Sequence, residues 1–191
     1  MKLFRSLISL MFFLLILTAC QQEKQLREVE QIKAEAASTK SEHLILVSER
    51  EHVFSDPGKP DKFRLVLTGD STLTGTAMLE IIRHDGTVIY QDTFATNYLI
   101  DYGITNSPTP QQMEAYITKR ATAFFEDDNF MQPALPGDRT FDANYSDKKI
   151  WEAVKRDTTA IGFYYKLGKE DGRYLAYSKE KGKVVLYFNC C

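Results

Sequence analysis

The chain has 191 residues, and its 24 Lys and Arg against 26 Asp and Glu give a formal net charge of −2 at neutral pH. This balance lacks the basic excess of a nucleic-acid-binding protein, so we expect no nucleic-acid partner. The length suits one domain, since a domain of about 150 residues buries close to 70% of its unfolded surface. With only three Cys, the core must be held by packing rather than by internal disulfides.

The N-terminus contains the parts of a secretory signal in their usual order. Lys2 and Arg5 supply positive charge, and residues 7–17 form an apolar stretch interrupted only by Ser9. This stretch is too short to cross a bilayer, which takes about 20 apolar residues. Small residues follow it, as they do at a cleavage site. We therefore predict that residues 1–19 are a signal peptide.

Leu17-Thr18-Ala19-Cys20 resembles the lipobox of bacterial lipoproteins, with an apolar residue, two small residues and a Cys directly after the apolar stretch. The resemblance covers only the signal peptide and Cys20. It implies a diacylglyceryl group on the Cys20 sulfur, cleavage before Cys20 and acylation of the new N-terminus; two or more acyl chains anchor stably. In such families an Asp after the lipidated Cys favours retention in the inner membrane. Because Gln21 follows Cys20 here, the resemblance favours the outer membrane, with the protein facing the periplasm. An ordinary secreted protein with a chance Cys near the cut is the alternative.

Residues 20–42 lack Gly and Pro and carry opposite charges four residues apart, as in Glu23–Arg27. Such pairs meet on one face of a helix. The apolar residues recur at helical spacing, but not over the three or four heptads of a coiled coil. We predict a lipid-anchored, partly helical tether at 20–42 and a single domain at 43–191.

The domain opens with strand candidates separated by turn residues. The sequence predicts strands at 43–49 and 62–69, with the Pro- and Gly-containing segment 55–61 between them as a loop. Residues 75–94 predict a hairpin around Asp85-Gly86, a pair that suits a two-residue type I′ turn.

That turn fixes the expected register of the hairpin. The facing pairs are Arg83 with Val88, Ile82 with Ile89, Ile81 with Tyr90, Leu79 with Asp92, and Ala77 with Phe94. Odd-numbered residues of the first strand and even-numbered residues of the second form the more apolar face, as in a half-buried antiparallel sheet. Asp92 is a polar residue on this face. We expect it at the rim of the core, because an unpaired buried charge is costly.

Residues 97–104 are expected to extend the sheet, and two helices are expected after them. In segment 107–128, Thr109 and Gln112 fit the N-cap and N3 positions of a capping box, with Pro between them at N1. A shorter helix is predicted within 146–156. Its apolar stripe comprises Ile150, Trp151 and Val154.

Strand candidates at 159–167, 173–179 and 183–189 predict a C-terminal meander. Two sets of residues each share a face: Ile161, Phe163, Tyr165 and Leu167 in the first strand, and Val184, Leu186 and Phe188 in the last. Strands, helices and strands follow one another without a βαβ repeat. The sequence therefore predicts an α+β fold with mainly antiparallel sheet, in which two helices separate the N-terminal hairpin from the three-strand meander.

Gly69-Asp70-Ser71 follows an apolar strand and resembles the nucleophile block of GDSL-class lipases and esterases. The resemblance implies an Asp-x-x-His base near the C-terminus. The three histidines are His43, His52 and His84, so this base is missing, and a Ser without a base is a weak nucleophile. We interpret Ser71 as a turn residue and assign no catalytic residue. A triad that uses another of the histidines stays open.

A second candidate motif begins at Asp142, which with Asn144 and Ser146 matches positions 1, 3 and 5 of an EF-hand-like calcium loop. Asp147 stands where that loop needs Gly, and Ala153 stands where it needs a bidentate Glu. We therefore predict no metal site, and a helix capped by Ser146 or Asp147.

The chain ends in Cys190-Cys191. We expect these two residues to end a strand without a further role. The next alternative is a disulfide within or between molecules, and the third is binding of a soft metal.

Tyr and Phe number 10 and 12, and many lie in the predicted meander. We expect most of them to be core residues and cross-strand pairs, with a ligand-binding aromatic face as the alternative.

These features favour a lipid-anchored cell-envelope protein that acts as a non-catalytic binding or interaction module. Its partners would be the membrane, through the lipid on Cys20, and a protein of the envelope, and no cofactor is expected. One alternative is an envelope hydrolase with an unrecognised site, which needs a His beside a Ser, Asp or Glu. The other is a small-ligand carrier, which needs an enclosed apolar pocket at the aromatic strands.

Overall fold

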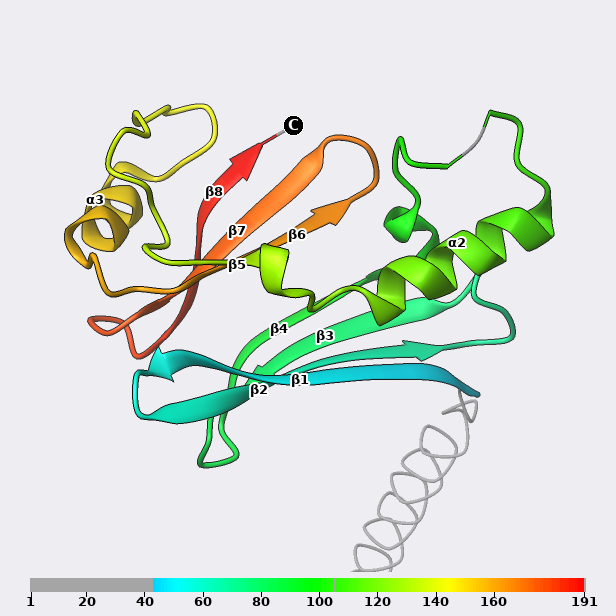
Figure 1. Ribbon diagram of the computed structural model, residues 1–191, viewed down its shortest axis with the longest axis horizontal. Helices are drawn as coiled ribbons and strands as arrows, with labels where there is room; N and C mark the ends of the chain where they lie inside the picture. The colour runs from blue at the N-terminus through cyan, green and yellow to red at the C-terminus, as the bar shows by residue number, and fades with distance from the viewer. Residues whose placement is uncertain (1–42, 105, 191) are drawn as a thin grey trace, which may run out of the picture. The chain divides into compact units, whose positions relative to one another are not determined.

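The computed structural model describes residues 43–104 and 106–190, which belong to the compact unit His43–Cys191. Two four-stranded antiparallel sheets form its framework, with strand orders β1-β2-β3-β4 and β5-β6-β7-β8 (Figure 1). The predicted α+β class with mainly antiparallel sheet is confirmed. The predicted signal peptide and tether, Cys20 and Cys191 lie outside the described residues.

The first sheet consists of β1 (Leu44–Asp56), β2 (Lys59–Thr68), β3 (Thr76–Ile82) and β4 (Val88–Ala95). The predicted loop at 55–61 is wrong, because only Pro57 and Gly58 separate β1 from β2. Pro60 is tolerated within β2 because it lies beyond Lys62–Ile82, the last pair that β2 makes with β3. Its missing N–H therefore costs no hydrogen bond to that neighbour.

The β3–β4 hairpin has the predicted register from Ala77–Phe94 to Ile81–Tyr90. Its turn differs from the prediction: the Gly86 N–H donates to the Arg83 carbonyl at 2.8 Å, and the Arg83 N–H to the Thr87 carbonyl at 2.8 Å. Only Gly86 has positive φ, at 87°, whereas a type I′ turn needs two such residues. The longer turn shifts the pairing, so that Ile82 faces Val88 rather than Ile89.

The chain does not extend this sheet after β4, which corrects the prediction for 97–104. It forms the 3₁₀ turn η1 (Thr96–Leu99), where the Thr96 hydroxyl donates to the Gly75 carbonyl at 3.0 Å. Leu99 is fully buried. Burial of this side chain in the core favours a compact turn over a further strand at the edge of the sheet.

Helix α2 (Pro110–Thr122) begins with the predicted capping box. The Thr109 hydroxyl accepts from the Gln112 N–H at 3.2 Å, and the Gln112 side chain accepts from the Thr109 N–H at 2.8 Å. Ile117 and Ala121 are fully buried and join the core between the sheets.

The second sheet and its helix complete the fold: η2 (Asp127–Asn129), β5 (Phe130–Met131), α3 (Lys148–Arg156), β6 (Gly162–Leu167), β7 (Asp171–Ser178) and β8 (Lys183–Cys190). The three strands of the meander are confirmed, and β5 was not predicted because two residues show no periodicity. The shared face expected for Val184, Leu186 and Phe188 is wrong at Phe188, because Val184 belongs to the core between the sheets whereas Phe188 packs against Trp151 of α3. A register shift in β7–β8 pairs Tyr174 with Phe188 and Leu175 with Leu186, which leaves Tyr187 as the extra, buried residue.

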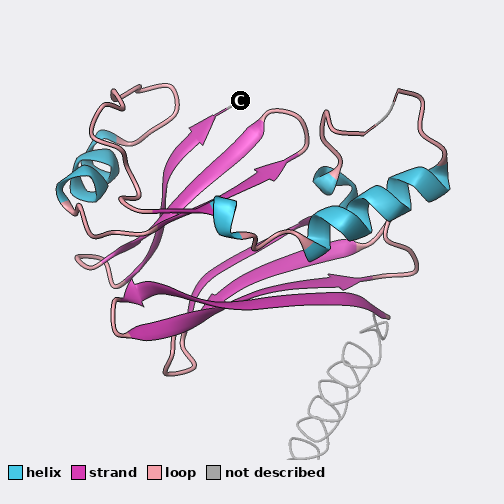
Figure 2. Ribbon diagram, in the orientation of Figure 1, coloured by secondary structure: helices cyan, strands magenta, loops and turns pink. Residues whose placement is uncertain are grey.

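The main core lies between the two sheets (Figure 2). Phe63 of β2 and Phe163 of β6 are both fully buried, with ring centroids 5.1 Å apart. A second cluster lies on the other face of the second sheet, where Trp151 and Val154 of α3 cover Val185 and Tyr187 of β8. Both faces of β8 are therefore packed.

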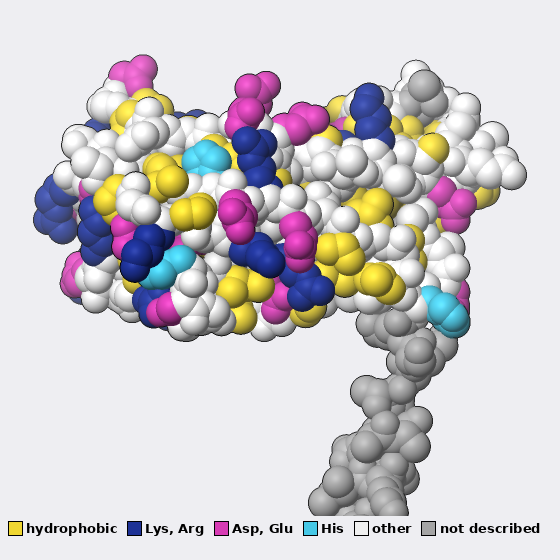
Figure 3. All heavy atoms as spheres, turned by 60° about the horizontal axis from the view of Figure 1, so that its bottom comes forward, with side chains coloured by type: hydrophobic (Ala, Val, Ile, Leu, Met, Phe, Trp, Pro, Cys, Tyr) yellow, Lys and Arg dark blue, Asp and Glu magenta, His cyan; other side chains and the backbone are white. Residues whose placement is uncertain are grey.

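The outer face of the first sheet mixes acidic and basic side chains (Figure 3). Arg64 lies 3.2 Å from Glu49 and 3.6 Å from Glu80, its neighbours on the adjacent strands. No helix among the described residues combines the length and apolar character needed to cross a membrane.

Candidate functional site

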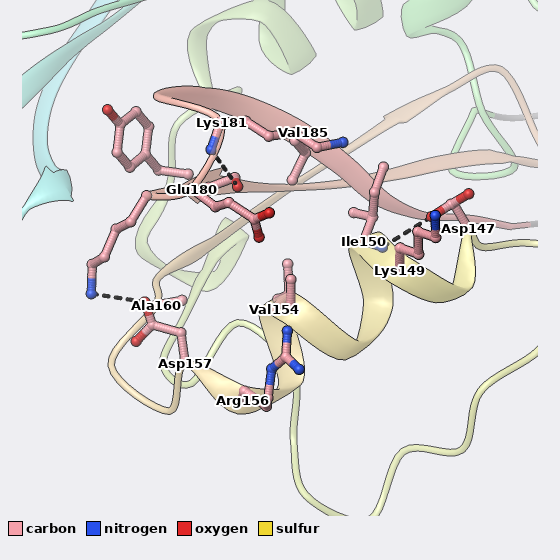
Figure 4. Close-up of a pocket in the computed structure, with 14 residues that line it drawn as sticks. Asp147, Lys149, Ile150, Val154, Arg156, Asp157, Ala160, Glu180, Lys181 and Val185 are labelled. Atoms are coloured by element: carbon pink, nitrogen blue, oxygen red, sulfur yellow. Dashed lines mark hydrogen bonds and ion pairs between the residues drawn. The ribbon is translucent and has the colours of Figure 1, made fainter.

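A groove of about 440 Å³ lies between α3 and the turn that joins β7 to β8 (Figure 4). Ligand sites in proteins commonly have volumes of about 300–1,000 Å³. Its lining comes from α3 and the segment after it (Asp147, Lys149, Ile150, Ala153, Val154, Arg156, Asp157 and Ala160), and from β7, the turn and β8 (Tyr177, Ser178, Lys179, Glu180, Lys181 and Val185).

The amphipathic pattern of α3 forms one wall of the groove. The Asp147 carboxylate caps the helix by accepting from the Ile150 N–H at 3.0 Å, as predicted for this residue. Trp151 packs on the second sheet and is only 2% exposed, with its ring 5.8 Å from that of Phe188. These contacts fix the helix against the sheet, while Ile150 and Val154 face the groove.

The floor of the groove is apolar. Val154, Ala160 and Val185 are 5%, 9% and 7% exposed, and the half-buried Ile150 and Ala153 continue this surface along α3. An apolar surface of this kind gains free energy by excluding water when a ligand covers it.

Charged side chains surround the floor. Lys179 of the β7–β8 turn lies 2.8 Å from Asp157, which follows α3. Figure 4 shows the Glu180 carboxylate pointing into the space between the turn and the helix. Hydrogen bonds from Lys179 and from the Thr159 hydroxyl and N–H lower the pKa of Asp157, although partial burial acts in the opposite direction. Asp157 therefore stays ionised under mildly acidic conditions.

The lining offers no nucleophile with an adjacent base. Its hydroxyls belong to Tyr177 and Ser178, and the Ser178 hydroxyl accepts from the Lys181 N–H at 3.2 Å. Neither His nor Cys is among the described residues that line the groove. An apolar floor within a charged rim is suited to binding a ligand rather than to acyl transfer.

Within the described chain, neither His52 nor His84 forms a side-chain hydrogen bond to a group that a hydrolase would need. His52 stacks on Phe130, and its Nδ1 lies 2.7 Å from the Val53 carbonyl. His84 Nδ1 is 3.9 Å from the buried Asp61 carboxylate, which is beyond hydrogen-bond distance. Asp61 instead accepts from the N–H groups of Ser55, at 2.6 Å, and His84, at 3.2 Å. It thereby ties the β1–β2 hairpin to the β3–β4 turn.

Ser71 and the calcium-like segment both have local structural roles. The Ser71 hydroxyl lies 3.1 Å from that of Thr74 within the β2–β3 connection, which confirms its assignment to a turn. Asp142 accepts from the Asn144 N–H at 2.8 Å. In the described part of the chain, no three His, Cys, Asp or Glu residues are arranged to hold a metal ion.

The aromatic residues of the meander are mostly packed, as predicted. Phe163, Tyr165 and Tyr187 are buried, while Tyr174 and Phe188 lie under the Arg139 guanidinium, 5.0 and 4.9 Å from their ring centroids. The groove itself contains a single aromatic side chain, Tyr177, among its described lining residues.

Of the three cysteines predicted to be lipidated or paired, the structure describes only Cys190. Cys190 ends β8 and is half-buried, but Cys191 and Cys20 lie outside the described residues. Pairing of Cys190 with Cys191 and lipidation of Cys20 stay predictions.

No protein-family model, curated protein or solved structure matches this chain.

Proposed function

We propose that the protein is a lipid-anchored protein of the bacterial cell envelope whose domain is a non-catalytic binding module. The groove between α3 and the β7–β8 turn supports this proposal. Its apolar floor lies in a recess large enough for a ligand, and its described lining residues include no nucleophile–base pair. The anchor is supported by the order of residues in Leu17-Thr18-Ala19-Cys20.

The anchor places the domain at a membrane surface. A signal peptide over residues 1–19 would direct export, and acyl chains on Cys20 would hold the mature chain in the bilayer. Gln21 favours the outer membrane with the domain facing the periplasm. Residues 20–42 would give the groove reach to ligands or proteins near that surface.

A variant that fills the groove tests the binding role. Ala153 is half-buried on the wall of the groove, so Ala153→Trp places a large ring over its floor. The control is Ala115→Trp, at an exposed position of α2 outside the groove. The lipidated protein is extracted from its own membrane and examined by native mass spectrometry for small molecules that remain bound.

We expect a non-covalent adduct on the wild type and on Ala115→Trp, and its loss from Ala153→Trp with the melting temperature little changed. Absence of any adduct from all three proteins, or an equal adduct on all three, would contradict binding in the groove.

A further inference from the structure

We propose that the groove binds a single-chain anionic amphiphile, whose apolar chain lies on the floor and whose carboxylate or phosphate lies at the rim. The inference rests on the proposed function and adds the chemical class of the ligand. It follows from the polarity of the floor and the charges around it.

The floor matches an apolar chain. Val154 of the floor comes from α3 and Val185 from β8, and Ala160 lies between these two elements in the sequence. None of these three side chains can donate or accept a hydrogen bond. A polar ligand would lose hydrogen bonds to water on this surface without replacing them, whereas a hydrocarbon chain would not.

The rim favours negative charge. Of its charged groups, Lys179 and Asp157 neutralise each other at 2.8 Å, and the Asp147 carboxylate accepts a hydrogen bond from the N-terminal turn of α3. Three cations remain, Lys149, Arg156 and Lys181. Within the described chain these three cations make no ion pair, and neither do the Asp147 and Glu180 carboxylates, so the lining carries four cations against three carboxylates.

This local excess of positive charge contrasts with the whole chain, whose net charge is −2. Removal of residues 1–19 would make the chain more acidic, since they contain Lys2 and Arg5 and no acid. Charge complementarity at such a site steers and orients an oppositely charged ligand.

The cations stand on both walls of the groove. Lys149 and Arg156 are seven residues apart, which puts them on one face of α3 about two turns apart. Lys181 comes from the opposing turn. An anionic head can therefore be held between the helix and the turn while its chain follows the floor.

Titration with eight-carbon probes tests the proposal. Octanoate, octyl phosphate, octyltrimethylammonium and octanol are titrated by calorimetry into the lipidated chain in zwitterionic nanodiscs, with empty nanodiscs subtracted. Tetraglutamate tests negative charge without an apolar chain. We expect octanoate or octyl phosphate to bind at least about tenfold more tightly than the other three probes, and the tighter of the two identifies the head group.

Charge variants locate the head group. Lys149→Glu and Lys181→Glu should each weaken the binding of the anionic probe by about fivefold, and Glu180→Gln should strengthen it. The matched controls are Lys148→Glu and Lys183→Glu, which change neighbouring exposed residues outside the lining and should leave binding unchanged.

Three results would overturn the inference: no binding of either octyl anion, binding of octyltrimethylammonium or tetraglutamate as tight as that of the anions, or equal effects of the variants and their controls. If octanol or octyltrimethylammonium binds at least as tightly as the octyl anions and Ala153→Trp abolishes that binding, the binding function stands and the anionic class is wrong. If no probe binds and Ala153→Trp leaves any native adduct unchanged, both proposals fail.

Discussion

Arg173 of β7 donates a 2.6 Å hydrogen bond to Asp92 of β4 and joins the two sheets by an ion pair. The Tyr165 hydroxyl donates to the same carboxylate at 2.9 Å and lies 2.7 Å from the Tyr90 hydroxyl. Asp171 holds the other side of the Arg173 guanidinium at 2.8 Å. Asp92 is thus half-buried, as expected from the cost of fully burying an unpaired charge, and its carboxylate is paired with Arg173.

Loss of this pair should destabilise the domain. Both side chains are mostly buried, at 22% exposure for Asp92 and 26% for Arg173, so Asp92→Asn and Arg173→Gln should each lower the free energy of unfolding by about 2 kcal/mol. Urea unfolding of the single and double variants gives the coupling energy. The exposed pair Arg64–Glu49 is the control and should contribute less than about 1 kcal/mol. Equal coupling energies in the two pairs would contradict a larger contribution of the Arg173–Asp92 ion pair to stability.

Gly162 packs against the segment that precedes α3. A Cβ there would lie 2.8 Å from Met131 Cγ, 3.1 Å from Ala134 Cα and 3.1 Å from the Tyr187 hydroxyl. Gly162→Ala should therefore lower the free energy of unfolding by about 1–3 kcal/mol, since backbone and a buried ring must shift. Gly137→Ala is the matched control, because nothing lies within 4 Å of its Cβ position. Similar denaturation midpoints for the two variants would contradict the close packing at Gly162.

The Lys179–Asp157 ion pair at the groove makes the free energy of unfolding depend on pH in the acidic range. The pKa of Asp157 lies below its ordinary value of 3.8 because Lys179 and Thr159 donate hydrogen bonds to its carboxylate. The folded state therefore favours the ionised form. Its contribution is present above about pH 4 and is lost as the pH falls through the lower, folded-state pKa. Urea midpoints measured from about pH 5 down to about pH 2 should fall less steeply for Asp157→Asn than for wild type. Parallel curves would refute this role.

The Tyr116 hydroxyl should ionise at a higher pH than an ordinary tyrosine. Burial, together with the hydrogen bond that its hydroxyl donates to Asp101, raises its pKa to about 12 from 10.0. The neutral hydroxyl is favoured in the folded state, so its contribution is constant below pH 10 and is lost as the pH rises towards 12. In an ultraviolet titration, Tyr116→Phe should lack the tyrosinate step near pH 12. A missing step near pH 10 instead would contradict the contact with Asp101.

Local sequence signals predicted much of the fold. The capping box at Thr109 marked the start of α2, and alternation predicted the β3–β4 pairs from Ala77–Phe94 to Ile81–Tyr90. Both signals act over a few residues, which is why they can be recognised without tertiary information. The exact turn after Arg83 could not be predicted, since Asp-Gly fits more than one turn type.

Long-range packing accounts for what the sequence did not predict. Leu99 favours a 3₁₀ turn because it fills the core between distant strands, and the register shift opposite Tyr174 moves Phe188 to the face of the sheet that packs on α3. The groove was missed for the same reason, since α3 and the β7–β8 turn come together only in the fold. Its local signal was the apolar stripe that contains Ile150 and Val154, but a stripe does not show which neighbour the helix faces.

The intact mass of the protein purified from its native membrane tests most directly whether this domain is held at a membrane through Cys20. We expect the mass of residues 20–191 plus a diacylglyceryl group and an N-terminal acyl chain. A chain cut at another position and carrying no acyl mass would contradict the anchor.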